Sequence, residues 1–152
     1  MSTHRHFEDF VLGETIDLGA YPVTKEEIIA FASEFDPQPF HVNEAAAKAG
    51  FFGGLVASGW HTVSMFMRMY YDQLVSKVAS EGAPGVDDLK WLRPVRPGDV
   101  LGGSATVTGL RASRSRPEIG FVSFDFVVTN QDDEAVMTLK STGMLRRREA
   151  SS

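Results

Sequence analysis

The chain has 152 residues and a formal net charge of -5 at pH 7, with 43% hydrophobic residues, 23% charged residues and no cysteine. This composition is typical of one folded globular domain, and the acidic balance argues against a nucleic-acid partner. The lack of cysteine excludes disulfides, zinc-thiolate sites and cysteine nucleophiles. We find no signal peptide and no apolar stretch of membrane-spanning length, so a cytoplasmic protein without a membrane partner is expected.

Two short helices are predicted in the first third of the chain. The first begins after Thr24, whose spacing to Glu27 matches a capping box, and it ends before Pro37. The second begins after Asn43, a candidate N-cap, and covers residues 44–49.

A longer helix is predicted after Gly54, and it ends at Gly82. Its apolar residues recur with a period of about 3.6, which is typical of a helix packed on one side. The predicted apolar face consists of Val63, Phe66, Met67, Tyr70, Leu74 and Val78. We interpret Met65, Met67 and Met69 as core residues, in preference to a stripe that contacts a cofactor.

From Gly85 onward the hydrophobic period becomes two, which indicates strands. Three strands are predicted here, over residues 100–110, 122–128 and 137–145, with a turn at 130–134 between the last two. A weaker strand at 14–18 completes an antiparallel sheet of four or five strands. The long helix would cover this sheet, which gives an α+β fold in one domain over residues 1–152. The tail from about 147 to 152 is expected to be flexible.

Asp36 and His41 are the first candidates for chemistry. Pro37 and Pro39 restrict the backbone between them, so the segment cannot continue the first helix. A carboxylate and an imidazole in one apolar pocket can divide acid and base roles. The alternative is structural, with Asp36 capping a turn and His41 capping a helix or making a local hydrogen bond. No metal is expected, because these residues match no metal-ligand motif.

Ser58 and Gly59 open the long helix and form the second candidate group. The backbone amide of Gly59 lacks an intrahelical partner, and with the helix dipole it can form an oxyanion hole. Ser58 is also a natural N-cap, and the two interpretations are compatible. The sequence contains neither the Gly-x-Ser-x-Gly motif of serine hydrolases nor a dinucleotide fingerprint.

Together these residues resemble the MaoC-like family of (R)-specific enoyl-CoA hydratases and acyl dehydratases, which have the hot-dog fold. The resemblance covers most of the chain and is sharpest over residues 36–59. The family motif has an Asp, an Asn-Pro pair, a His and a later Ala-His-Gly. Its positions are matched by Asp36, Pro39, His41, Ala57 and Gly59. Gln38 stands in place of the usual Asn, and Ser58 in place of the usual His.

The resemblance implies reversible addition of water to a trans-2-enoyl thioester, which gives an (R)-3-hydroxyacyl thioester. Asp36 would act as the base, and His41 would orient the water and relay the proton. The Gly59 amide would bind the thioester oxygen, with Gln38 and Ser58 as supporting residues.

The resemblance also implies an acyl-CoA or acyl-carrier substrate, no separate cofactor, and a homodimer or a higher oligomer of dimers. Phe40 and Trp60 are expected to contact the substrate. Arg114 and Arg116 either bind the phosphates of coenzyme A or belong to a solvated loop. Two other functions remain open: a hot-dog acyl-CoA thioesterase, and a catalytically silent acyl-CoA-binding protein.

Overall fold

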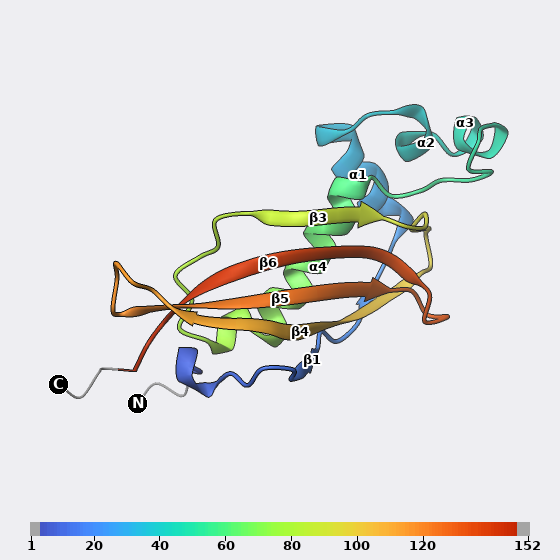
Figure 1. The fold of residues 1–152 in the computed structure, drawn as a ribbon. Helices are drawn as coiled ribbons and strands as arrows, with labels where there is room; N and C mark the ends of the chain where they lie inside the picture. Colours follow the sequence, from blue (N-terminus) through green and yellow to red (C-terminus); the bar gives the residue numbers. More distant parts are fainter. Residues whose placement is uncertain (1–3, 149–152) are drawn as a thin grey trace.

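The computed structural model describes residues 4–148, which form a single antiparallel sheet with one long helix across it (Figure 1). The sheet has six strands, and the main path runs β1-β4-β5-β6-β3, with β2 also paired to β4. The strands are β1 (Thr15–Asp17), β2 (Tyr21–Pro22), β3 (Val86–Trp91), β4 (Val100–Ala112), β5 (Ile119–Thr129) and β6 (Ala135–Arg146). All of these pairings are antiparallel.

The long helix α4 (Gly59–Gln73) lies behind the sheet in Figure 1 and supplies one side of the core. Phe66 of α4 packs on Phe126 of β5, with ring centroids 4.9 Å apart. The alternating residues of β5 explain this contact, because Phe124, Phe126 and their neighbours two positions away are all buried on the helix side. Burial of these rings contributes much of the hydrophobic stabilisation of the fold.

The first two predicted helices are confirmed. In α1 (Lys25–Phe35), Thr24 is the N-cap and accepts a hydrogen bond from the Glu27 amide. In α3 (Glu44–Ala49), Asn43 is the N-cap. The prediction did not include the single-turn helix α2 (Pro39–Val42), in which Pro39 occupies the first position. Proline suits that position because its missing N–H would have no intrahelical partner there.

The long helix is shorter than predicted. It ends at Gln73, and the chain continues as a 3-10 helix, Val75–Lys77, instead of running on to Gly82. Val78 then forms a bridge with Arg5, so its apolar side chain reaches the core from an extended segment. The spacing of Leu74 and Val78 fits a continued helix equally well, so the sequence pattern could not reveal where the helix ends. Met67 is also 44% exposed, which corrects its assignment to the core, whereas Met65 and Met69 are buried.

The strands predicted from β4 onward are confirmed within a few residues, and so are the turn between β5 and β6 and the weak strand β1. Two strands, β2 and β3, were missed. β3 lacks the alternation of a half-buried strand, since five of its six residues are exposed and one is partly buried. It forms an edge of the sheet and pairs with β6 alone.

The C-terminal end of the described chain is attached to its N-terminal end. Arg147 and Arg148 form ion pairs with Glu8 and Asp9, respectively, so these two residues differ from the flexible tail that was expected. Residues 149–152 of that tail lie outside the described residues. Within residues 4–148, no helix combines the length and apolar character needed to cross a membrane.

Candidate active site

Asp36 lies where α1 ends, and its carboxylate accepts two side-chain hydrogen bonds. Gln38 Nε2 donates to Oδ1 over 2.8 Å, and Ser58 Oγ donates to Oδ2 over 2.7 Å. The hydrogen bond from Gln38, the bond from Ser58 and the positive charge that His41 carries when protonated lower the pKa of Asp36 against the opposing effect of burial. The carboxyl group is therefore held in its ionised form.

His41 faces Asp36 from the single turn of α2. Its Nδ1 lies 2.6 Å from the carbonyl oxygen of Val56, and its Nε2 lies 3.4 Å from Asp36 Oδ2. A carbonyl oxygen can only accept, so Nδ1 carries a proton. In the neutral ring, Nε2 is then an acceptor that can take up a proton beside the carboxylate.

Ser58 connects the Asp36 carboxylate to the start of α4. Its hydroxyl donates to Asp36 and accepts a hydrogen bond from the Trp60 amide, so both functions of the hydroxyl are used. The residue is completely buried, whereas Gln38 is exposed. Ser58 thus supplies the sheltered hydrogen bond to Asp36.

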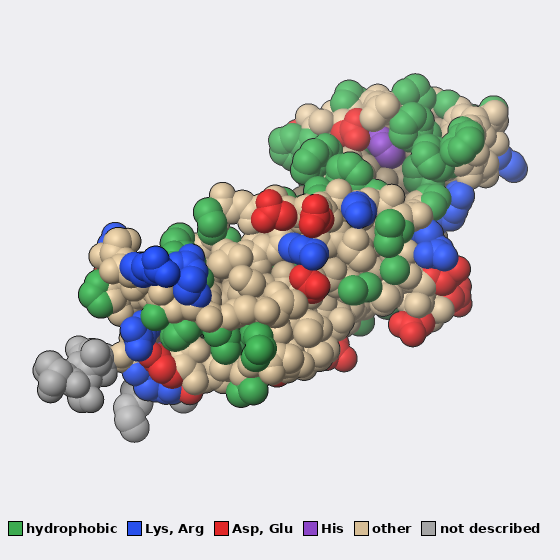
Figure 2. Space-filling view, viewed as in Figure 1, with side chains coloured by type: hydrophobic (Ala, Val, Ile, Leu, Met, Phe, Trp, Pro, Cys, Tyr) green, Lys and Arg blue, Asp and Glu red, His purple; other side chains and the backbone are tan. Residues whose placement is uncertain are grey.

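A cavity of about 350 Å³ opens beside His41. Its walls include Phe40, Phe52, Trp91 and Leu92, and Arg93 contributes a positive charge to the lining. Asp36 is not one of the residues that line the cavity, and its Oδ2 lies 3.4 Å from Nε2 of His41, which does line it. Hydrophobic side chains gather over this α2 and α3 end of the molecule (Figure 2), which fits an apolar substrate group.

Gly59 lines the same cavity and is in close contact with Trp91. The indole Nε1 donates to the Gly59 carbonyl over 3.0 Å, and a Cβ atom at Gly59 would lie 2.3 Å from the indole ring. Sequence reasoning did not select Trp91, because it belongs to the missed edge strand β3. The available signal was a large aromatic residue two positions before Arg93.

Of the predicted substrate contacts, Phe40 lines the cavity beside His41. Trp60 is instead 58% exposed and packs edge-on against Trp91. Arg114 and Arg116 lie in the hairpin between β4 and β5, at the far end of the sheet from α2 and α3 (Figure 1). Arg116 is paired there with Glu118. Within one chain, therefore, neither arginine is near the Asp36–His41 pair.

A long helix wrapped by an antiparallel sheet, with an acid–imidazole pair at the start of that helix, is characteristic of a hot-dog dehydratase. The chain belongs to the family described as the MaoC like domain, whose model matches residues 9–131. The predicted α+β hot-dog fold is confirmed, because this structure closely matches the solved structure of a MaoC-like dehydratase.

A MaoC-like dehydratase from Rhodospirillum rubrum has a solved structure with a TM-score of 0.87 and 37% identity, and the match covers 96% of this chain and 99% of the other. The (R)-specific enoyl-CoA hydratase of the same organism is 33% identical over 78% of this chain and 77% of its own length. YdeM of Bacillus subtilis, described as uncharacterized, is 26% identical, and the match covers 92% of this chain and 98% of YdeM.

Proposed function

We propose that the protein is an enoyl thioester hydratase that reversibly adds water to a trans-2-enoyl group and forms the (R)-3-hydroxyacyl thioester. The observation that carries the proposal is the contact between Asp36 Oδ2 and His41 Nε2, 3.4 Å apart beside an apolar cavity. The family and the relative named (R)-specific enoyl-CoA hydratase support it.

The hydrogen bonds of the pair suit it to hold one water molecule. The Asp36 carboxylate and the neutral Nε2 of His41 are both acceptors, so a water molecule between them can donate one hydrogen to each. The oxygen lone pair of that water is then free to attack C3 of the enoyl group. Asp36 takes up the proton as the new carbon–oxygen bond forms.

The remaining steps need a stabilised enolate and a proton at C2. Electrons from the C2–C3 double bond move to the thioester oxygen, where the Gly59 amide at the start of α4 can donate a hydrogen bond. Asp36 passes the proton that it took from water to His41 Nε2, 3.4 Å away, and Nε2 delivers it to C2, so the product gains a hydroxyl at C3 and a hydrogen at C2. No other reactant is needed.

We further propose that the thioester is carried by coenzyme A or by an acyl carrier protein. The apolar walls formed by Phe40 and Phe52 suit an acyl group, and Arg93 places a positive charge at the same cavity, where a phosphate-bearing carrier would enter. Arg114 and Arg116 lie far from Asp36 and His41 of the same chain. They could therefore bind the carrier's phosphates only at the site of a second copy of the chain.

The test follows the absorbance of the conjugated enoyl thioester after crotonyl-CoA and longer enoyl-CoAs are added, with free thiol measured in parallel. We expect the enoyl band to disappear without thiol release. Asp36→Asn and His41→Gln should each lower the rate about 10²–10⁴-fold with the fold unchanged. Asp132→Asn, in the exposed turn after β5, is the matched control and should keep full activity.

Two results would overturn the proposal. Thiol release that depends on Asp36 would identify a thioesterase. Stabilisation of the protein by acyl-CoA, with no change in the enoyl band across the panel, would identify a protein that binds the thioester without transforming it.

A further inference from the structure

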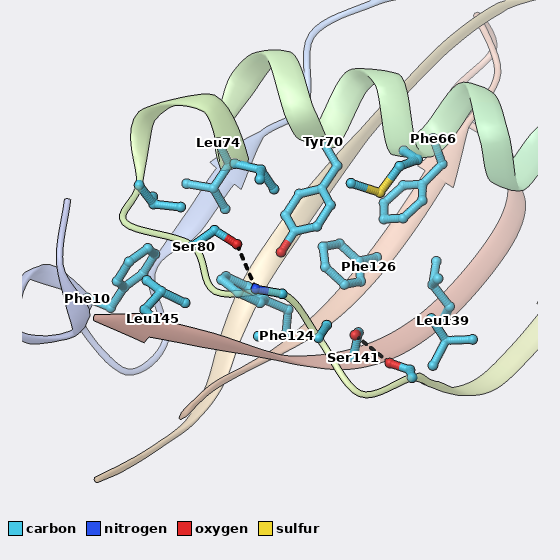
Figure 3. Close-up of a pocket in the computed structure, with 18 residues that line it drawn as sticks. Phe10, Phe66, Tyr70, Leu74, Ser80, Phe124, Phe126, Leu139, Ser141 and Leu145 are labelled. Carbon is cyan, nitrogen blue, oxygen red and sulfur yellow. Dashed lines mark hydrogen bonds between the residues drawn. The ribbon is translucent and has the colours of Figure 1, made fainter. Parts of the chain in front are cut away.

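A second cavity, of about 230 Å³, lies along the C-terminal half of α4, and no residue of the His41 cavity lines it (Figure 3). It is the more enclosed of the two, although the acid–imidazole pair belongs to the other. Its walls come from α4, the inner faces of β5 and β6, and the segment that leads into β3. The cavity is therefore built by the core of the fold.

The cavity is apolar and large enough for a small organic group. Phe10, Phe66, Phe124, Phe126 and Leu139 are part of its wall, and none of the described residues that line it carries a charge. An apolar cavity of about 150 Å³ engineered in another protein binds benzene. The volume found here consequently admits a ring or a branched chain of at least that size.

Tyr70 places one polar atom in this apolar space. Its ring is fixed between Phe66, with centroids 5.6 Å apart in a stacked arrangement, and Phe126, 4.9 Å away. The hydroxyl points into the cavity (Figure 3), and no described residue forms a hydrogen bond with it. Burial raises the pKa of Tyr70 to about 12, so the hydroxyl keeps its proton at neutral pH and can donate it.

The other hydroxyl groups of the wall are already engaged. Ser141 donates to the Gly85 carbonyl over 2.8 Å, and Ser80 accepts from the Gly82 amide over 3.3 Å. Both bonds are drawn in Figure 3. Among the described wall residues, Tyr70 is thus the hydroxyl that takes part in no hydrogen bond, and its donor is directed at the cavity.

We propose that this cavity binds an apolar group that carries one neutral acceptor oxygen, such as a ketone or an ether, and that Tyr70 donates the recognising hydrogen bond. A pure hydrocarbon would displace water from the hydroxyl without offering it a hydrogen-bond partner, which is costly. A carboxylate would be buried without a counter-charge. The proposal stands independently of the hydratase reaction.

The experiment compares two ligands of similar shape, acetophenone and cumene, which differ in the presence of a carbonyl oxygen. Their Kd values are measured by titration followed by NMR of the folded protein, so no catalytic activity is required. We expect acetophenone to bind about tenfold more tightly than cumene, which corresponds to one net hydrogen bond. In Tyr70→Phe the preference should vanish while cumene still binds.

Two further variants serve as controls. Tyr71→Phe removes a hydroxyl from the neighbouring, exposed tyrosine and should keep the wild-type preference. Gly143 lines the cavity, and a Cβ there would meet Leu145 at 3.5 Å, so Gly143→Val should fill the space and weaken both ligands. Equal affinity of the two ligands in the wild type, no binding of either, an unchanged preference in Tyr70→Phe or unchanged affinities in Gly143→Val would each overturn the proposal.

Discussion

The ionised state of Asp36 depends on its two hydrogen-bond donors, which differ in their surroundings. The bond from Gln38 is exposed to solvent and so competes with water, while the bond from Ser58 is enclosed at the start of α4. Buried hydrogen bonds to a charged group are stronger than exposed ones. Ser58 is therefore the residue that we expect to fix the orientation of Oδ2 toward His41.

Gln38→Met tests the contribution of the amide to the charge of Asp36. Methionine keeps the length of the side chain and removes the donor, so the lowered pKa of Asp36 should move up toward its ordinary value of 3.8. In the wild type, the ionised Asp36 stabilises the fold above the unfolded pKa. That contribution is lost as the pH falls from the unfolded pKa through the lower folded pKa, so in Gln38→Met it should be smaller and its loss should be complete at a higher pH.

The pKa is measured by a carbon-13 NMR titration of the Asp36 carboxyl group, alongside urea unfolding between pH 2 and 7. Ser58→Ala should move the pKa in the same direction. A pKa that stays at the wild-type value in both variants would show that neither hydrogen bond controls the charge.

At the residue scale, the sequence predicted the pairing of Asp36 with His41, but it did not predict the hydrogen bond from Ser58 that positions Asp36. Asp36 and His41 could be paired because five positions and two prolines separate them along the chain. The contact between Ser58 and Asp36 spans 22 positions and depends on how α1 packs beside the start of α4. No local pattern encodes that packing.

The contact between α4 and β3 is the element-scale feature that shapes the site. Gly59 begins α4 and Trp91 ends β3, and the indole occupies the space where a side chain at position 59 would be. The glycine is thus required by packing between two elements, in addition to any use of its amide. Helix periodicity indicated α4 but could not reveal this contact, because β3 has no alternating pattern.

A double-mutant cycle tests this contact. Gly59→Ala should destabilise the protein in the wild-type background, since the methyl group would lie 2.3 Å from the indole ring. In a Trp91→Ala background the same change should cost less, with a coupling free energy of about 0.5–3 kcal/mol. Urea unfolding of the four proteins measures the coupling. Simple additivity would mean that Trp91 does not restrict position 59.

For the whole molecule, the free edge of β3 is the surface that we expect to join two copies. Val86, Trp91 and Leu92 are 53%, 46% and 48% exposed on or directly after this edge strand. The unpaired edge of a strand can hydrogen-bond with another chain, and exposed apolar side chains beside that edge favour such pairing. Because Trp91 and Leu92 also line the His41 cavity, a second copy at this edge would close part of that cavity.

Val86→Lys tests the edge by placing a charge where the second copy would pack. We expect a dimer in the wild type and a larger monomer fraction in the variant, measured by analytical ultracentrifugation at several concentrations. Val11→Lys changes a valine outside the sheet that is 64% exposed, and it should leave the dimer intact. A wild-type monomer, or equal behaviour of both variants, would contradict the expected interface.

The ion pairs that join Arg147 and Arg148 to Glu8 and Asp9 give the backbone the topology of a nearly closed ring. A ring has no preferred starting point, so the order in which its elements are synthesised is not dictated by the fold itself. Circular permutation exploits this freedom. A short connector across the paired ends, with new termini cut into the hairpin that carries Arg114 and Arg116, would interrupt neither the Asp36–His41 pair nor the cavity of Tyr70.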